Sequence, residues 1–327
     1  MADTILKTDI QGVPRFITGK VRDVYDVGDA LLLVTTDRLS AFDVVLPTGI
    51  PDKGRVLTQL SAFWFDHTKD IVANHVITTD IDEIASRLKA AGATNVDDAL
   101  LASLEGRSLL GKKCHAVPLE CVVRGYLAGS GWADYKKLFA HGGEVILHGH
   151  HLPVGLRESD KLPAPLFTPS TKAAEGHDES VDAKRAVEIV GQELFDKLQS
   201  TSIAIYQAAS DYAAERGLII ADTKFEFGLT YPQPLPEGKG AAEPELILID
   251  EALTPDSSRF WDASIYKPGK SQPSFDKQYV RDYLLTLDWD KTYPGPELPV
   301  DVARNTAVKY REAYRRLTGR ELLVYRI

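Results

Sequence analysis

The sequence predicts an α+β protein with a small antiparallel-sheet N-terminal domain, residues 1–112, followed by a larger α+β domain, residues 113–327. Three observations support this class. Short strand-like runs separated by turn residues open the chain, one long helical pattern fills residues 180–216, and two apolar strands within residues 218–249 form a hairpin. At 327 residues, the chain is long enough for two ordinary domains.

Residue periodicity justifies the individual elements in chain order. Strands alternate apolar and polar residues, whereas helices repeat apolar residues every three or four positions. On this basis we expect strands at 21–28 and 31–37, helices within 56–72 and 79–91, a strand run at 114–129, loops around one strand at 144–147 within 141–170, a helix at 180–216, paired strands at 218–228 and 245–249 joined by a polar loop at 231–245, and helices at 276–287 and 301–318.

Turn and capping residues mark the ends of several elements. Gly28-Asp29 is a hairpin turn signal between the first two strands. Ser180 and Asp301 are candidate N-caps, because their side-chain oxygens can accept hydrogen bonds from the first free amides of a helix. Gly217 and Gly319 are candidate stops, since glycine readily takes the left-handed conformation that ends helices. These residues therefore mark the expected ends of one helix that begins near residue 180 and of another that begins near residue 301.

Composition and charge exclude several classes of function. The net charge is -9 at pH 7, whereas non-specific binding to nucleic acid or to a membrane surface needs an excess of Lys and Arg. The two cysteines, Cys114 and Cys121, form no CxxC pair, so neither a disulfide framework nor a cysteine zinc site is indicated. No signal-peptide pattern and no run of about 18 apolar residues occurs. We expect a cytoplasmic protein that binds neither nucleic acid nor membrane.

The stretch LIIADTKFEFG, residues 218–228, carries a charge at every second position of an otherwise apolar strand, at Asp222, Lys224 and Glu226. If the hairpin places Glu226 opposite Asp250, the two carboxylates and Lys224 share a face that can hold magnesium and a phosphate. A solvated strand face explains the same alternation, so both interpretations stay open on this segment alone. The adjacent acids Asp250-Glu251 at the end of the apolar strand LILI favour ligand binding.

Two further segments have residues that suit phosphate binding. TGKVRDVYDVG places Gly19, Lys20 and Arg22 at a hairpin start, although it lacks the glycine motifs of common nucleotide-binding loops and can equally be a basic edge strand. VPLECVVRGYLAGSGW has Arg124 before Gly129-Ser130-Gly131, a combination that suits a phosphomonoester but is also typical of a flexible loop.

Two histidine-containing segments need separate interpretations. FTPSTKAAEGHDES combines Lys172 with His177 and Asp178; a polar loop with a helix cap explains the acids but not Lys172. HGHH, residues 148–151, lacks a third spaced ligand, so we expect a surface loop and no zinc site there. Serine hydrolase chemistry is not indicated either, because no GxSxG motif occurs.

Taken together, these segments resemble the SAICAR synthetase (phosphoribosylaminoimidazole-succinocarboxamide synthase) family of purine biosynthesis. VPLECVVRGYLAGS and IADTKFEFG are similar to its two signature motifs; GKVRDVYDVGD, TTDRLSAFDVVLP, FTPSTKA with GHDE, and LIDEALTPDSSRFW are similar to other segments, in the family's order. The resemblance covers essentially the whole chain. It implies an ATP- and magnesium-dependent ligase that joins L-aspartate to carboxyaminoimidazole ribotide (CAIR), giving SAICAR, ADP and phosphate. It also implies a nucleotide cleft between the two domains, similar to protein kinases and ATP-grasp enzymes.

The resemblance implies a role for each matching residue. ATP would contact Gly19, Lys20, Arg22, Pro118, Leu119, Glu120 and Lys224, with residues 118–120 as the adenine hinge. Magnesium would be held by Glu226 and Asp250. CAIR, chiefly its phosphate, would contact Arg124, Ser130 and Arg259, with Asp37, Arg38, Ser40, Asp43 and His177 also lining the substrate site. The catalytic residues would be Lys224, Lys172 and Asp178. Some members have Lys where this sequence has Arg22, which keeps the charge but changes its geometry.

Two other functions use the same residues. A small-molecule kinase would need no aspartate and would leave the phosphate on its product. A non-catalytic nucleotide-binding regulator is disfavoured, because Lys20, Lys224, Glu226 and Asp250 are all present. The sequence leaves open the oligomeric state, the residues that bind aspartate and the role of Asp222.

Overall fold

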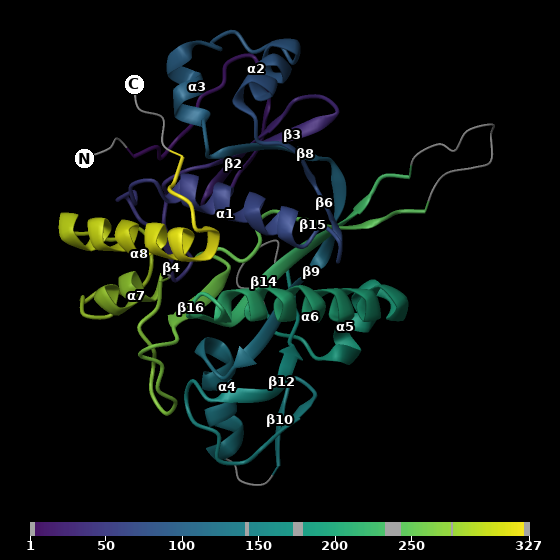
Figure 1. Cartoon of the computed structure of the whole chain (residues 1–327), viewed down its shortest axis with the longest axis vertical. Coiled ribbons are helices and arrows are strands. Elements are labelled where there is room, and N and C mark those ends of the chain that lie inside the picture. The colour runs from purple at the N-terminus through teal and green to yellow at the C-terminus, as the bar shows by residue number, and fades with distance from the viewer. Residues whose placement is uncertain (1–3, 141–143, 173–178, 233–242, 276, 324–327) are drawn as a thin grey trace.

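The computed structural model describes residues 4–140, 144–172, 179–232, 243–275 and 277–323, and it confirms the α+β class (Figure 1). An antiparallel five-stranded sheet is built from the N-terminal part of the chain. Its strands are, in spatial order, β1 (Arg15–Thr18), β2 (Arg22–Asp26), β3 (Ala30–Thr35), β8 (Ser108–Lys112) and β7 (Val76–Thr78). No helix among the described residues is both long enough and apolar enough to cross a membrane.

The first sheet buries one face beneath two short helices, α2 (Ile81–Ala90) and α3 (Asp98–Leu104). Tyr25, Leu32 and Val34 lie in this small core. Strand residues alternate between faces, so Arg22 lies on the opposite face, where it reaches across to the end of a strand in the second sheet. The first sheet therefore brings a cation to the region between the two sheets.

The second sheet is larger and forms the centre of the molecule (Figure 1). Its main path is β12 (Lys161–Phe167), β9 (Cys114–Tyr126), β14 (Leu218–Thr230), β15 (Leu246–Ile249) and β6 (Ala73–Asn74), with β13 (Ser170–Thr171) beside β9 and β16 (Ser258–Asp262) beside β14. The chain passes from the first sheet to the second at Lys113, between β8 and β9.

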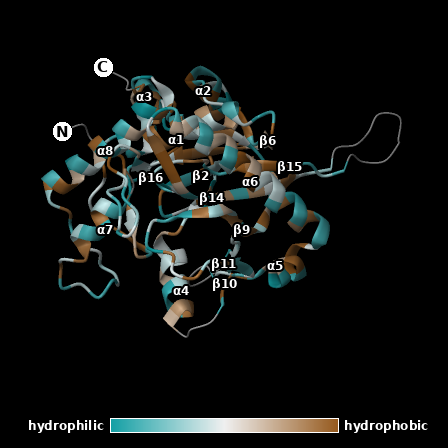
Figure 2. Ribbon diagram, turned by 60° about the horizontal axis from the view of Figure 1, so that its bottom comes forward, coloured by the Kyte–Doolittle hydropathy of each residue, from teal (hydrophilic) through white to brown (hydrophobic). Residues whose placement is uncertain are grey.

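The main core joins this second sheet to helices from both ends of the chain. It contains residues of α1 (Lys53–His67), α6 (Gln192–Ala214) and α8 (Val300–Thr318), which pack with Phe225 and Phe227 of β14. Figure 2 shows the apolar residues gathered in the central strands, with polar residues on the outer helices. Because α1 and β6 precede residue 113 yet pack with the second sheet, the domain boundary at residues 112 and 113 stays a prediction.

The remaining elements extend this framework. A two-stranded hairpin, β4 (Ser40–Ala41) and β5 (Val44–Val45), packs against α7 (Gln278–Leu284) and α8. Beyond β9, the chain forms α4 (Gly129–Ala140) and a second hairpin, β10 (Val145–Leu147) with β11 (His150–Leu152). The described part of the region 141–170 thus holds β10, β11, β12 and the first residue of β13, where one strand was expected. Its third strand, β12, contains two prolines, which an edge strand tolerates because one side needs no partner.

The single helix expected over residues 180–216 is wrong in one respect. The structure has two helices, α5 (Ala183–Val190) and α6, because Gly191 takes a φ of 83° that interrupts the helical hydrogen bonding. The N-cap of α5 is Asp182, whose side chain accepts from the amide of Arg185, and not Ser180. In α8 the N-cap position is Pro299, which makes no side-chain capping hydrogen bond, and Asp301 lies within the first turn of the helix instead of capping it. Gly319 ends α8 in the left-handed conformation as expected.

Strand β14 changes the parity of its buried face at a β-bulge. Leu218 and Ile220 lie in the main core, and so do Phe225 and Phe227. A regular strand cannot bury both even-numbered and odd-numbered residues on one face. The pairing of β14 with β16 shifts between Ile220 and Asp222, which leaves one extra residue there. The bulge thereby turns Asp222, Lys224 and Glu226 away from the core, onto one shared face.

Candidate functional site

A row of opposite charges lies on the face of the second sheet that points away from the main core. Lys224 Nζ is 2.5 Å from Glu120 Oε1 on the neighbouring strand β9. Lys172, which follows β13, forms an ion pair with Glu226. Glu226 is opposite Glu120 in the β9–β14 register, so the two carboxylates are neighbours on the sheet. Lys224 pairs with Glu120, and Lys172 pairs with Glu226. The structure thus brings together four charged residues from three separate segments of the chain.

Asp250 lies at the end of this row but one position away from its expected register. Glu226 is opposite Ile249, not opposite Asp250. The ladder ends there, because Asp250 turns out of the strand with a φ of 64°, a conformation that is uncommon outside glycine. Its charge nevertheless acts on Glu226: burial and then the charge of Asp250 raise the pKa of Glu226, while Lys172 and Lys224 oppose the rise. The two carboxylates are therefore close enough to repel each other.

Arg22 connects the first sheet to this end of the row. One guanidinium nitrogen donates to both carboxylate oxygens of Asp250, at 2.9 and 2.8 Å, and the other lies 3.1 Å from Glu251. Burial alone would lower the pKa of Arg22, but Asp250 and Glu251 raise it above the usual value. Arg22 therefore stays charged and links the two sheets across the site.

Two repelling carboxylates beside lysines suit a hard divalent cation. Magnesium uses one or two protein carboxylates and takes its other ligands from water and phosphate oxygens. In the part of the chain that the structure describes, no group of three or more His, Cys, Asp and Glu side chains could hold a metal ion alone. Glu226 and Asp250 thus suit a cation whose other ligands include phosphate oxygens. They suit a structural metal site, in which the protein supplies all the ligands, less well.

The loop between β1 and β2 carries Gly19 and Lys20. The amide of Gly19 donates to the carbonyl of Arg22 at 2.7 Å, which closes a tight turn, and Lys20 pairs with Asp43. Arg38 lies beneath this loop and donates to the carbonyls of Gly19 and Lys20, at 2.9 and 3.3 Å. The basic loop is therefore held from below by a buried arginine.

The predicted substrate residues Asp37, Arg38, Ser40 and Asp43 fall into two groups in the structure. Asp37 and Arg38 are buried, whereas Ser40 and Asp43 lie in the β4–β5 hairpin. Asp37 is fully buried; it accepts from the amide of Gly54 at 2.9 Å and pairs with Arg107 at 3.0 Å. Asp37 and Arg38 thus support the loops from inside, and their contact with a substrate stays a prediction. Ser40 lies in β4, and Asp43 occupies the turn that follows, where its left-handed φ of 64° directs the chain back toward β5.

The predicted hinge lies in the middle of β9. Leu119 and Glu120 pair with Thr171 and Ser170 of β13. Leu119 is fully buried, and the carboxylate of Glu120 belongs to the charged row described above. Pro118 is exposed beside them. His177 and Asp178, which were predicted to lie near the imidazole or the transferring phosphate and not at the hinge, are outside the described residues.

A second polar cluster contains Arg124, Ser130 and Arg259. Arg124 donates to Ser130 Oγ at 3.1 Å and to Thr168 Oγ1 at 3.0 Å. Gly129 takes a φ of 54°, and a Cβ there would overlap the Arg259 guanidinium, so only glycine lets these segments approach so closely. The segment 129–131, for which a flexible loop was one interpretation, is the first turn of α4. Its free amides add to the positive character of the cluster.

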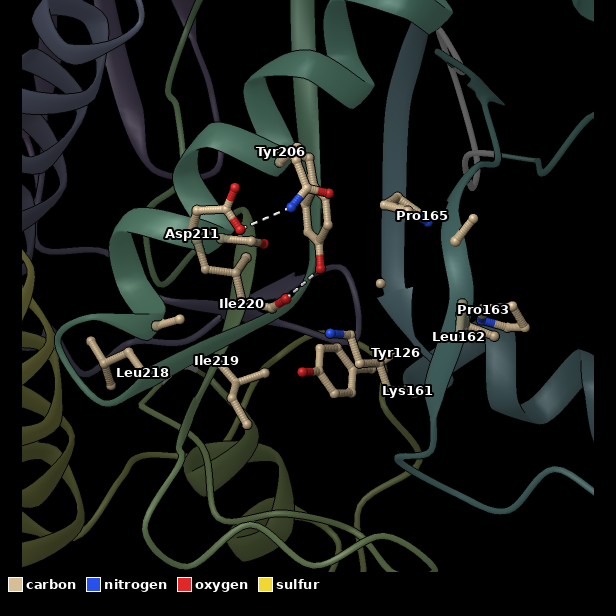
Figure 3. A pocket seen from close by; sticks show the side chains of 15 residues that line it. Tyr126, Lys161, Leu162, Pro163, Pro165, Tyr206, Asp211, Leu218, Ile219 and Ile220 are labelled. Atoms are coloured by element: carbon tan, nitrogen blue, oxygen red, sulfur yellow. Dashed lines mark hydrogen bonds between the residues drawn. The ribbon is translucent and has the colours of Figure 1, made fainter.

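A small polar cavity of about 160 Å³ adjoins this cluster. It is lined by Ala128, Gly129, Glu158, Ser159, Arg259, Trp261, Ser271, Gln272, Ser274 and Gln278. A larger cavity of about 250 Å³ lies elsewhere, between α6, β12 and the first residues of β14, and none of the predicted site residues lines it (Figure 3). Of these two cavities, the polar one adjoins the predicted substrate residues.

Sequence patterns left one buried residue beside the predicted site, Asp222, without a role, and did not indicate another, His75. Asp222 accepts hydrogen bonds from both Arg124 and Arg259, and its partners become visible only when three strands are assembled. His75 lies between the two sheets, with Nδ1 3.3 Å from the carbonyl of Leu248 and no hydrogen-bond partner at Nε2. Burial lowers the pKa of His75 to about 4, so the ring is neutral. No motif surrounds His75 that could have indicated it.

The HGHH segment is a hairpin rather than a loop. His150 and His151 belong to β11; His150 Nε2 is 2.8 Å from the carbonyl of Phe167, and His151 Nδ1 is 2.6 Å from Glu144. These rings therefore bond to other parts of the chain and do not converge on a common point.

Comparisons with known proteins agree on one family. The family model described as SAICAR synthetase matches residues 15–296. A phosphoribosylaminoimidazole-succinocarboxamide synthase of Geobacter sulfurreducens is 52% identical over 321 residues, which cover 98% of this chain and 99% of the relative. A relative of the same name from Thioalkalivibrio sulfidiphilus is 54% identical, with the same coverage.

Solved structures extend the similarity to three dimensions. The SAICAR-synthase from Saccharomyces cerevisiae in complex with SAICAR has a TM-score of 0.81 and 41% identity, covering 97% of this chain and 99% of its own. A SAICAR synthetase (Type-2) in complex with ADP has a TM-score of 0.61 and 25% identity, covering 93% and 98%.

Proposed function

The chain belongs to the SAICAR synthetase family, and we propose on that basis how its own residues carry out the family's reaction. It is an ATP-dependent carbon–nitrogen ligase that joins L-aspartate to CAIR in purine biosynthesis. The small-molecule kinase that was considered as an alternative is not favoured by these comparisons. Binding of magnesium, the residue roles below and a cytoplasmic location are proposals. They find support in the charged row on β14 and its neighbours, and above all in the repelling pair Glu226 and Asp250.

The charged row is proposed to bind the ATP phosphates and magnesium. Lys20, Arg22 and Lys224 would neutralise phosphate oxygens, and Glu226 and Asp250 would hold the metal ion. When bound, magnesium supplies charge neutralisation on the phosphate oxygens during transfer. Arg22 already contacts Asp250, so metal binding would compete with Arg22 for that carboxylate and free the guanidinium for the nucleotide.

The second cluster is proposed to bind the ribotide phosphate through Arg124, Ser130 and Arg259. The two clusters share strand β14, on which Asp222 and Glu226 are four residues apart, or roughly 13 Å at about 3.3 Å per residue. In CAIR the phosphate and the carboxylate are at opposite ends of the molecule. A ribotide anchored by its phosphate at the arginines would therefore extend its carboxylate toward the magnesium end of the row.

The chemistry requires an activated carboxylate. Direct displacement of oxide from a carboxylate by an amine is prohibitively slow, so transfer of the γ-phosphoryl group first forms an acyl phosphate on CAIR. The aspartate amine then attacks the acyl carbon and phosphate leaves. Lys172 and Lys224 are proposed to stabilise the negative charge that develops on the transferring group, and His177 and Asp178 are proposed to lie near it. Positioning and charge stabilisation suffice, so no enzyme nucleophile is needed.

Omission of single substrates tests the reaction. With CAIR, L-aspartate and MgATP all present, we expect the release of ADP and phosphate and the formation of SAICAR. Chromatography of the reaction mixture measures these products. Omission of aspartate should abolish SAICAR formation and reduce phosphate release to the slow hydrolysis of the acyl phosphate. A stable phosphorylated product, formed at an undiminished rate without aspartate, would instead identify a kinase.

Magnesium affinity should fall as the pH is lowered. Burial and the charge of Asp250 raise the pKa of Glu226, so this carboxylate takes up a proton at a higher pH than an exposed glutamate. The proton competes with the metal. Calorimetric titration of magnesium into the ADP-bound protein should therefore give a dissociation constant that rises on the acid side of this pKa and is constant above it. A constant value throughout would contradict the assignment of Glu226.

The same shift has a consequence for the metal-free protein. Between the usual pKa of a glutamate and the raised value, the folded state binds more protons at Glu226 than the unfolded state does. The contribution of Glu226 to the free energy of unfolding should therefore decrease as the pH rises through this window. Added magnesium should reverse that decrease, because it binds the deprotonated carboxylate in the folded state.

A further inference from the structure

Asp222 joins the two arginines of the proposed ribotide site. Its Oδ2 accepts from Arg259 at 2.5 Å and from Arg124 at 3.3 Å. The three residues belong to neighbouring strands, and the register places Asp222 directly opposite Arg124 on β9 and opposite Arg259 on β16. The side chains of Asp222 and Arg124 are each 6% exposed, whereas that of Arg259 is 25% exposed. The triad therefore reaches solvent mainly through Arg259, beside the polar cavity.

Helix α6 contacts the two strands that carry Asp222 and Arg124, β14 and β9, next to this triad. The hydroxyl of Tyr206, on α6, donates to the carbonyl of Ile220 at 2.7 Å, at the start of the β-bulge (Figure 3). The same hydroxyl occupies the space that a Cβ of Gly125 would need, next to Arg124. Without the bulge, Asp222 would fall on the same face as Ile220, in the main core. The bulge and its support by Tyr206 therefore present Asp222 to the arginines.

The charges of the triad depend on Asp222. Burial lowers the pKa of Arg124, the carboxylate of Asp222 opposes this shift, and the charge of Arg259 adds to it. Without Asp222, two guanidinium groups would repel each other across a buried space. With it, the triad carries a net charge of +1, and the two guanidinium groups are held at a fixed separation.

We propose that Asp222 is a positioning residue for the ribotide phosphate, which holds Arg124 and Arg259 in the spacing that a phosphomonoester needs. The proposal rests on the proposed function, because it takes these arginines as the phosphate ligands. Asp222 itself would not contact the phosphate, since a carboxylate repels a phosphate. Its effect would reach CAIR through the two guanidinium groups, and neither ATP nor the metal ion would depend on it.

The variant Asp222→Asn tests this role, because it keeps the size of the side chain and removes the charge. We expect the KM for CAIR to rise about tenfold or more, corresponding to the loss of a charge-assisted hydrogen bond, with kcat changed less than about threefold and the KM for ATP unchanged. Asp262→Asn is the matched control: Asp262 pairs with Arg316 at 2.8 Å, at the other end of β16, and its loss should leave the KM for CAIR unchanged.

Competitive inhibition by inorganic phosphate distinguishes a positioning role of Asp222 from a purely electrostatic one. In Asp222→Asn the net charge of the cluster rises from +1 to +2, so a purely electrostatic role predicts tighter competitive inhibition by phosphate against CAIR. A positioning role predicts weaker inhibition, in parallel with the raised KM. Tighter inhibition would overturn the proposal, and so would a variant that shows no cooperative unfolding transition by calorimetry, because Asp222 would then serve the fold.

Arg259→Ala distinguishes failure of this inference from failure of the proposed function. If Arg259→Ala raises the KM for CAIR but Asp222→Asn does not, the positioning role is wrong and the ribotide site stands. If neither variant changes the KM for CAIR, the ribotide site itself is wrong, and the inference falls with it.

Discussion

Replacement of Asp250 by Asn should lower kcat by roughly 10²- to 10³-fold, the range found when one stabilising group for transition-state charge is removed. Asn is among the few residues that tolerate the left-handed conformation, so the φ of 64° at this position can be kept while the charge is lost. Glu226 would then be the sole carboxylate at the proposed metal site. Steady-state kinetics over a range of magnesium concentrations should show a raised half-saturation point as well as a lower maximum.

Glu251→Gln provides the comparison for this result. Glu251 lies 3.1 Å from Arg22, so its loss also weakens the link between the sheets, but we do not assign it to the metal. We expect a much smaller decrease in kcat and little change in the magnesium requirement. Equal losses in both variants would show that anchoring of Arg22, and not metal binding, explains the effect of Asp250.

Loss of the charge on Lys224 should have an effect of similar size. The Lys224→Met variant keeps most of the length of the side chain and removes its charge. We expect kcat to fall roughly 10²-fold or more, because a fixed cation no longer neutralises the transferring phosphoryl group. The variant should also unfold at a lower temperature, since Glu120 is only 5% exposed and would lose an ion-pair partner at 2.5 Å. Rates and calorimetry on the same preparation measure both effects.

Two further variants separate the chemical role of Lys224 from its structural one. Lys224→Arg retains the charge but not the geometry, so it should restore the unfolding temperature more fully than kcat. Lys69→Met removes a lysine that pairs with Asp66 at 2.8 Å on the surface, far from the charged row in the sequence, and should leave both quantities unchanged. A Lys224→Met enzyme that keeps most of its kcat would exclude Lys224 from phosphoryl transfer.

Local sequence patterns predicted the fold correctly where residues close together in the sequence decide the structure. The helical spacing over residues 79–91 is confirmed by α2, which Asp80 caps, and the hairpin of β14 and β15 follows from two apolar strands around a polar loop. The pattern over residues 180–216 is helical on both sides of Gly191, and periodicity alone could not reveal that this glycine would take a positive φ. Helix α4 was missed, because three small residues at its start are as typical of a loop.

The site was predicted less completely, because its geometry depends on pairing between distant strands. Periodicity indicated that Lys224 and Glu226 share a face, but it could not show that the pairing of β14 with β15 places Ile249, not Asp250, opposite Glu226. Asp250 follows the last pair, in a left-handed conformation. Arg22 resembled a phosphate ligand in the sequence, and the structure shows it also linking the two sheets. Such links join residues more than two hundred positions apart, which no local pattern can register.

The sequence by itself determined the family, the α+β class and the residue types that the chemistry needs, because long motifs and strand periodicity are properties of neighbouring residues. Only the tertiary structure decided the face on which LIIADTKFEFG presents its charges. The bulge between Ile220 and Asp222 reverses the parity of the strand, so that aromatic residues remain in the core while three charges point the other way. It also gave Asp222 its partners, since a carboxylate acquires two arginines only when three strands pair in register.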